Sequence, residues 1–171
     1  MNGFRRTATA VAALMMVGLT AGCSTGTSIK SPFSTQPPVL LSGPEYEITT
    51  GTVNGLGTVL VDGKGITVYM FATDVRGHPS RCYNICAVQW PPVVLPPGVS
   101  KPVAGAGIHP SLLGTAPRTD GSTQLTYNGW PLYLWPPDRA PGQATGQALT
   151  NAGGLWYALT PAGKPIVTPS P

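Results

Sequence analysis

Two aspartates close two copies of one short pattern, Tyr-x-(Phe/Trp)-x-x-Asp, and are the first candidates for chemistry. The first copy ends at Asp74 and the second at Asp138. Paired carboxylates can do acid–base work on glycosides. The simpler alternative makes each aspartate a turn-former whose carboxylate accepts backbone N–H bonds. We expect the turn role, because no other catalytic constellation accompanies the pair and the sequence has no Gly-x-Ser-x-Gly nucleophile elbow.

A thiol near the N-terminus, Cys23, predicts a lipid anchor. Residues 1–22 start with Arg5 and Arg6, continue through an uncharged apolar run and end in small residues. This is the layout of a signal peptide, and the run is too short to span a bilayer. The segment Leu19-Thr20-Ala21-Gly22-Cys23 resembles the bacterial lipobox, whose cysteine sulfur receives a diacylglyceryl group. We therefore predict export, cleavage before Cys23, and anchoring by acyl chains such as palmitate on the outer face of the cell membrane.

The other two cysteines, Cys82 and Cys86, could bind a metal or carry out redox chemistry. With His78 nearby, the pair offers ligands for Cu(I) or an exchangeable redox couple. Two further soft or borderline ligands are His109 and Met70. In an oxidising compartment the simpler expectation is a structural disulfide, which stabilises by ~2 kcal/mol on the chain-entropy model. We therefore predict the disulfide and no cofactor.

Composition favours strands and turns over helices. Charged residues are 9% of the chain, with 22 Gly and 20 Pro, a composition that makes many turns. The formal net charge is +4, and Arg5 and Arg6 supply two of these charges. The few remaining basic residues are scattered singly, which excludes the basic patch of a nucleic-acid-binding protein.

The chain divides into four predicted regions. Residues 1–22 are the lipoprotein signal peptide, and residues 23–43 are the lipidated cysteine and a Ser-, Thr-, Gly- and Pro-rich flexible tether. Residues 44–167 form a β-domain, and residues 168–171 form a disordered tail.

An internal repeat organises the β-domain, with copies at about residues 55–94 and 113–166. The copies align without a gap, in the pairs Gly65 with Gly129, Tyr69 with Tyr133, Phe71 with Trp135, and Asp74 with Asp138. Each copy reads as a strand, a glycine-containing turn and a second strand, followed by a tryptophan-led segment at residues 90–94 or 156–160. Residues 45–53 alternate like a further strand, and residues 95–112 look like a long connection.

These elements predict a small all-β domain with approximate internal two-fold symmetry, either a sandwich or a barrel. An isolated hairpin is marginal in water, so we expect the two hairpins and their tryptophan segments to share a core. A closed barrel would also remove exposed edges. On each motif strand the two aromatic residues should point to one face, and their neighbours Val68 and Met70, or Leu132 and Leu134, to the other.

The repeated motif resembles the one for which a family of secreted-repeat lipoproteins, best known from actinobacteria, is named. Other pieces resemble the family too: residues 56–62, the Cys82/Cys86 pair followed by Trp90-Pro91-Pro92, residues 127–133, and Trp156-Tyr157. The resemblance covers about residues 55–165. It implies no activity, because the function of the family is itself unknown.

The leading functional interpretation is non-enzymatic: a membrane-tethered module that binds an envelope protein, a glycan or a small molecule. It depends on the anchor, the tether and many aromatic residues (Trp130, Tyr133, Trp135, Trp156 and Tyr157). The alternatives are copper or redox handling by Cys82 and Cys86, and hydrolysis by Asp74 and Asp138. An exposed row of aromatics favours the first, facing thiols favour the second, and carboxylates saturated by hydrogen bonds count against the third.

Overall fold

The computed structural model describes residues 43–167. The predicted signal peptide, Cys23, nearly all of the predicted tether and the tail 168–171 lie outside the described residues. Between residues 43 and 167, no helix is long and apolar enough to cross a membrane.

The first copy of the repeat is built from short strands and one short helix. It contains β1 (Glu47–Val53), β2 (Gly57–Asp62), β3 (Val68–Phe71) and α1 (Ile85–Gln89). A connection with β4 (Val103–Ala104) and the 3-10 helix η1 (Pro110–Leu112) leads to the second copy. That copy contains β5 (Leu113–Pro117), β6 (Thr123–Tyr127), β7 (Trp130–Pro131), β8 (Tyr133–Leu134), β9 (Thr150–Asn151) and β10 (Gly154–Ala158).

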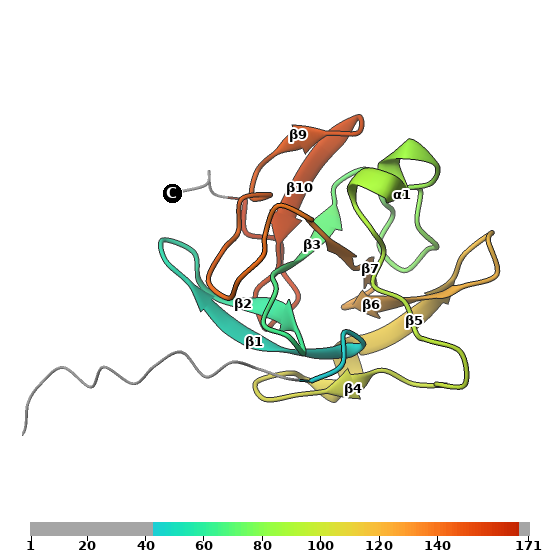
Figure 1. The fold of residues 1–171 in the computed structure, drawn as a ribbon, viewed down its shortest axis with the longest axis horizontal. Helices are drawn as coiled ribbons and strands as arrows, with labels where there is room; N and C mark the ends of the chain where they lie inside the picture. Colours follow the sequence, from blue (N-terminus) through green and yellow to red (C-terminus); the bar gives the residue numbers. More distant parts are fainter. Residues whose placement is uncertain (1–42, 168–171) are drawn as a thin grey trace, which may run out of the picture. The chain divides into compact units, whose positions relative to one another are not determined.

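The strands form three small sheets, with orders β2-β1-β4, β8-β3-β10-β9 and β5-β6-β7. None of these sheets closes into a barrel, so the all-β prediction is confirmed and the sandwich is the alternative that fits. The middle sheet mixes the two copies, because β3 of the first copy lies between β8 and β10 of the second. Figure 1 shows β3 beside β10. Each copy is therefore incomplete without the other.

The hairpin turns show where the two copies differ in length. Asn128 and Gly129 have positive φ values of 48° and 80°, which is the two-residue turn that Asn-Gly favours. In the first copy Asp62 holds a longer turn, since its Oδ1 accepts the N–H groups of Lys64 at 2.9 Å and Ile66 at 2.8 Å. Outside these turns the pairs are Val61 with Thr67 and Thr126 with Pro131, so the first copy has one extra residue.

The gapless alignment is therefore correct for the residues that follow the turn and wrong for those that precede it. In the structure Leu60 corresponds to Leu125, whereas the gapless alignment matches Leu60 with Gln124. Both leucines donate their N–H to the tryptophan-led segment of a copy, to the carbonyls of Leu159 and Val93 respectively. One extra residue within a turn does not change the hydrophobic pattern of the strands on either side, so the sequence does not reveal it.

The two faces of the motif strands enter two different clusters, as predicted. Tyr69 and Phe71 pack with Tyr133, Trp90 and Trp156. On the other face, Val68 and Met70 pack with buried aliphatic residues such as Leu60, Leu125, Leu132 and Leu159.

Two local elements escaped prediction. The connection predicted at residues 95–112 carries β4, which pairs in parallel with β1 through Glu47 with Val103 and Ile48 with Ala104. Two residues are too few to show a period. The five-residue helix α1 lies within the segment between Cys82 and Trp90, for which no helix was predicted.

Candidate functional site

The two copies exchange hydrogen bonds through their repeated motif. The hydroxyl of Tyr69 donates to Asp138 at 2.5 Å, and the hydroxyl of Tyr133 donates to Asp74 at 2.6 Å. The exchange arises because β3 and β8 pair antiparallel with Tyr69 opposite Tyr133. Each tyrosine therefore reaches the aspartate of the other copy, and neither copy satisfies its own.

Each aspartate also holds the loop that follows it. Asp74 accepts the backbone N–H of Arg81 at 2.7 Å, and Asp138 accepts that of Thr145 at 2.8 Å. These two loop positions lie seven residues beyond their aspartates, so they are equivalent in the repeat. Asp138 further accepts the Thr145 hydroxyl at 2.6 Å. Both carboxylates are buried and use both oxygens, as turn-formers do.

Burial sets the protonation behaviour of this group. Desolvation raises the pKa of Asp74 above its usual value, although the hydrogen bond from Tyr133 and the backbone N–H of Arg81 act in the opposite direction. Desolvation, together with the neighbouring carboxylates, raises the pKa of Tyr69 and Tyr133 well above 10. Both phenols therefore stay protonated at neutral pH and serve as permanent donors.

Four aromatic rings, two from each copy, form a continuous stack. Trp90 and Trp156, one from each copy, lie at the centre with ring centroids 3.9 Å apart and planes 2° apart. Phe71 stacks on Trp156 at 4.1 Å, and Trp135 stacks on Trp90 at 4.3 Å. The second aromatic of each motif therefore lies on the tryptophan of the other copy, and each such pair adds about 0.5–1.5 kcal/mol beyond its buried area.

The two ends of the stack differ. Phe71 is only 4% exposed. Gly154 covers it so closely that a Cβ there would lie 2.7 Å from the phenyl ring. Trp135 is half-buried, stacks on one ring within the described residues, and lines a surface cavity. One end of the stack is therefore closed and the other opens to solvent.

The cysteines form the predicted disulfide, between Cys82 and Cys86. Both are buried beside the aromatic stack. Arg118 of the second copy, itself buried, donates to the Cys82 carbonyl at 2.9 Å and to Gln124 at 2.6 Å. The disulfide loop is thereby fastened to the second copy, which is a structural role.

The weak metal candidates are not brought together. His78 and His109 are exposed in loops, and Met70 lies in the other hydrophobic cluster. Within residues 43–167 no three His, Cys, Asp or Glu side chains group so as to hold a metal ion.

The exposed row of aromatics that would favour the binding interpretation is not present among these five residues. Tyr133 and Trp156 are fully buried, while Trp130, Trp135 and Tyr157 are half-buried. Trp130 and Tyr157 pack against the aliphatic cluster, away from the stack. Of this set, only Trp135 lines one of the cavities described next.

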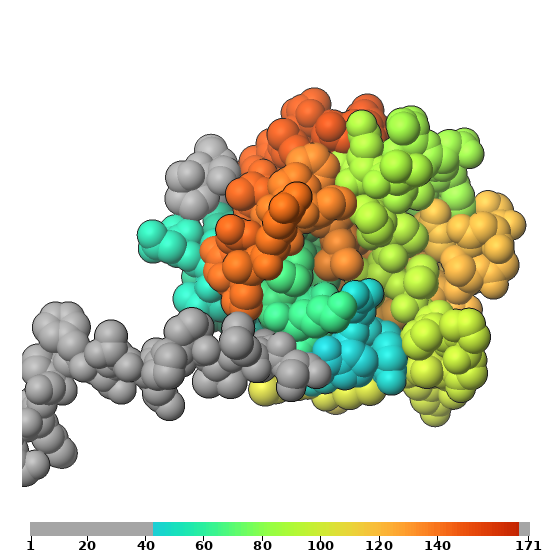
Figure 2. All heavy atoms as spheres, in the orientation of Figure 1, coloured from blue at the N-terminus to red at the C-terminus, as the bar shows by residue number. Residues whose placement is uncertain are grey.

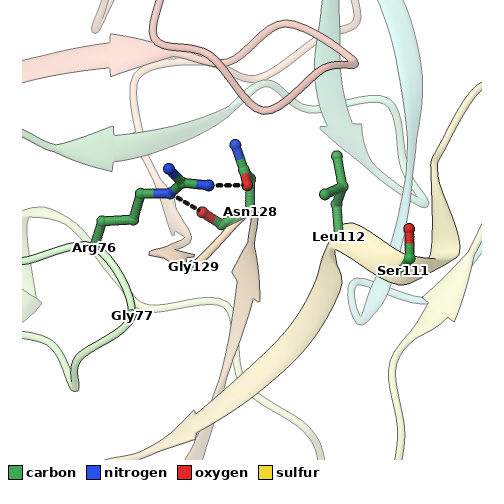
Figure 3. Close-up of a pocket in the computed structure, with 6 residues that line it drawn as sticks. All are labelled: Arg76, Gly77, Ser111, Leu112, Asn128 and Gly129. Carbon is green, nitrogen blue, oxygen red and sulfur yellow. Dashed lines mark hydrogen bonds between the residues drawn. The ribbon is translucent and has the colours of Figure 1, made fainter.

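A small cavity of about 480 Å³, the Arg76 cavity, lies where the first copy's loop meets the second copy's hairpin turn. Its lining is Arg76, Gly77, Ser111, Leu112, Asn128 and Gly129. We call the line where the loop of one copy meets the hairpin turn of the other a seam. This seam is closed, because Gly77 donates its N–H to the Gly129 carbonyl at 2.8 Å. Arg76 donates to the Asn128 carbonyl at 2.6 Å and to the side-chain oxygen of Asn128 (Figure 3).

A second cavity, of about 530 Å³, lies at the equivalent seam of the repeat, between the first copy's hairpin turn and the second copy's loop. We call it the Trp135 cavity. Its lining is Glu45, Asp62, Lys64, Ile66, Pro91, Leu134, Trp135, Pro136, Asp138, Arg139 and Pro141. In Figures 1 and 2 the orange segment after β8 lies beside the green hairpin that joins β2 to β3.

The difference between the two seams has a chemical cause. When Asp74 is matched with Asp138, Gly77 corresponds to Pro141. Proline has no N–H to donate, so the bond that closes the first seam cannot form at the second. The second copy's loop is held instead by Thr67, whose hydroxyl donates to the Gln143 carbonyl at 2.6 Å.

Two polar groups of the Trp135 cavity have hydrogen-bonding capacity to spare. Asp62 is 1% exposed as a residue, and its Oδ1 accepts both turn N–H groups. Its Oδ2 accepts no hydrogen bond within residues 43–167, and because no fully buried side-chain oxygen there lacks a partner, Oδ2 is not itself a fully buried acceptor. Desolvation raises the pKa of Asp62. The indole N–H of Trp135 likewise has no partner there, whereas those of Trp90 and Trp156 donate to Asn151 at 3.0 Å.

Sequence reasoning found the motif residues but missed this cavity. The sequence predicts no site role for Asp62, Arg139 or Pro141. The available signal was the mismatch between copies: proline where the first copy has glycine, and Asp62 at a turn position where the second copy has an aromatic residue.

A family model described as a secreted repeat of unknown function matches the chain twice, at residues 52–94 and 114–160. No curated protein and no solved structure matched. The two matched segments fall within the two structural copies and together span more than half of the chain, and the description marks the protein as exported. The chain therefore belongs to this family of secreted repeats and carries two copies of the repeat.

Proposed function

We propose that this exported protein is a non-catalytic binding module, tethered to the outer face of the cell membrane through lipid on Cys23, and that its ligand in the envelope occupies the Trp135 cavity. The lipobox-like segment before Cys23 supports the anchor. The observation that carries the binding proposal is the open seam, where Trp135 ends the aromatic stack at a cavity of about 530 Å³.

The cavity has the composition of a ligand site. Its walls are mainly apolar, from Ile66, Leu134, Trp135 and several prolines, and a few polar groups converge on them. Trp135 rests on the buried Trp90, so its position is fixed before any ligand arrives. A fixed platform lowers the entropy cost of binding.

The two alternative functions have less support. Hydrolysis would need a carboxylate of the motif pair to exchange protons with substrate, but Asp74 and Asp138 are buried with both oxygens in hydrogen bonds. Thiol-based metal or redox handling would need Cys82 and Cys86 as thiols at an accessible place. They are instead bonded to each other and buried beside the stack.

The binding proposal is tested by retention of the detergent-solubilised full-length protein on insoluble envelope material from the expression host. Trp135→Ala is expected to reduce retention at least tenfold. The matched control is Trp130→Ala, which removes a half-buried tryptophan that does not line the cavity. Equal retention of the two variants would contradict the proposal. Mass spectrometry of the N-terminal peptide tests the anchor, which predicts a diacylglyceryl group on Cys23.

A further inference from the structure

The Trp135 cavity offers one flat aromatic face beside several hydrogen-bond acceptors. Trp135 is the only aromatic side chain among the residues that line it. Trp90 stacks on one face of its indole, and no second aromatic ring within residues 43–167 stacks on the half-exposed Trp135. Close by, the buried Asp62 has its Oδ2 unpartnered within the described residues.

These groups define what the ligand must present. A carboxylate oxygen in the cavity wall gains most from a hydrogen-bond donor, because an acceptor left unsatisfied after a ligand displaces water costs about 1–3 kcal/mol. The indole N–H of Trp135 needs an acceptor, and the rim adds the cation Arg139 and the ion pair between Glu45 and Lys64. A fitting ligand therefore has a flat apolar face and hydroxyl groups around its edge, which act as both donors and acceptors.

A pyranose ring has this layout. Its axial C–H bonds form an apolar face that can lie on an indole ring, and its equatorial hydroxyls point outward to polar partners. Resting on the proposed binding function, we infer that the Trp135 cavity binds a sugar ring of an envelope glycan, with Trp135 as the stacking platform and Oδ2 of Asp62 as the acceptor for a sugar hydroxyl.

Two other ligand classes fit less well. A proline-rich peptide would lie on tryptophan, but it brings few N–H donors to Asp62 and Glu45. A quaternary ammonium is held best by several aromatic faces, and the lining of this cavity provides one.

The substitution Asp62→Asn tests the inference with little disturbance of the turn. The asparagine oxygen can still accept the N–H groups of Lys64 and Ile66, which Oδ1 of Asp62 accepts at 2.9 and 2.8 Å. The second carboxylate oxygen becomes an NH₂ group, so the cavity loses this acceptor. Asp120→Asn is the matched control, since Asp120 is exposed and lies outside the cavity lining.

The measurement is isothermal titration calorimetry of the detergent-solubilised full-length protein. The probes are neutral hexose oligosaccharides, N-acetylhexosamine oligosaccharides, a proline decapeptide and tetramethylammonium chloride. We expect oligosaccharide binding by the unsubstituted protein and by Asp120→Asn, and at least tenfold weaker binding by Asp62→Asn and Trp135→Ala.

The inference is overturned if no oligosaccharide binds, if the decapeptide or the ammonium ion binds instead, or if Asp62→Asn binds as well as Asp120→Asn. The retention assay separates this failure from that of the binding function. Envelope retention that depends on Trp135 but comes without oligosaccharide binding would keep the function and remove the sugar.

Discussion

The two seams of the repeat are equivalent in position and opposite in state. At one, Gly77 donates to Gly129 and Arg76 to Asn128, so loop and turn are joined. At the other, Pro141 takes the place of Gly77 and no such bond forms, which leaves the Trp135 cavity. A duplicated unit can thus use one copy of a contact to hold its structure and release the other copy for binding.

The two ends of the aromatic stack also differ, one closed and one open, and substitutions there have the largest expected effect on stability. Phe71→Ala should lower the free energy of unfolding by about 3–5 kcal/mol, because it empties a buried site. Trp135→Ala should cost roughly 1–2 kcal/mol, since a half-exposed ring removes less buried area and leaves a smaller cavity on truncation than a fully buried one. Urea denaturation of the two variants measures both values. Equal losses would show that the two ends are not different.

The exchanged Tyr–Asp bonds should matter equally in both copies. Tyr69→Phe and Tyr133→Phe should each lower the free energy of unfolding by about 1–3 kcal/mol, because each leaves a buried carboxylate short of a donor. The same denaturation experiment compares them. A loss in one variant alone would mean that only one of the two bonds supports the fold.

The same tyrosines predict a dependence on alkaline pH. Their pKa values in the folded protein lie above the usual 10.0, so the stability they contribute is complete below about pH 10 and is lost as the pH rises further. The free energy of unfolding should therefore fall above pH 10 in the unsubstituted protein. The fall should be shallower in the Tyr69→Phe/Tyr133→Phe double variant. Parallel pH profiles for the two proteins would refute this assignment.

The disulfide distinguishes the loops that follow the two motifs. Cys82 and Cys86 staple the first loop, whereas the second depends on hydrogen bonds to Asp138 and Thr67. Replacing both cysteines with serine should cost about 2 kcal/mol, the value expected for so short a loop. Thermal unfolding with and without reductant measures it. If reductant left the unfolding temperature unchanged, the disulfide would have no such role.

The seams themselves give the smallest effect on stability. Arg76→Ala removes two hydrogen bonds to Asn128 and should cost about 1 kcal/mol. Arg139→Ala should change stability by less than about 0.5 kcal/mol, because the exposed Arg139 side chain has no hydrogen bond or ion pair within residues 43–167 and its backbone bond to Gln143 is kept. A larger loss in Arg139→Ala would show that the second seam is not open in solution.

Much of the fold follows from the sequence because it is local. Glycine in the turns, alternation on the motif strands and the repeat itself predicted the hairpins and the two faces of residues 68–71. The exchange between Tyr69 and Asp138 could not be predicted, because it needs the order of strands in the middle sheet. Asp62 could not be predicted as a site residue for a related reason. Its turn role uses only Oδ1, and the place of its second oxygen beside the cavity depends on the tertiary fold.

The most direct test of the central claim, that the open seam is the binding site, follows the four tryptophan indole N–H signals by NMR in ¹⁵N-labelled protein. Solubilised envelope glycan is the titrant. The account predicts that the Trp135 signal shifts, while those of Trp90 and Trp156, which are bonded to Asn151, stay in place. A Trp135 signal that does not move while another tryptophan signal shifts would place the ligand elsewhere and contradict the account.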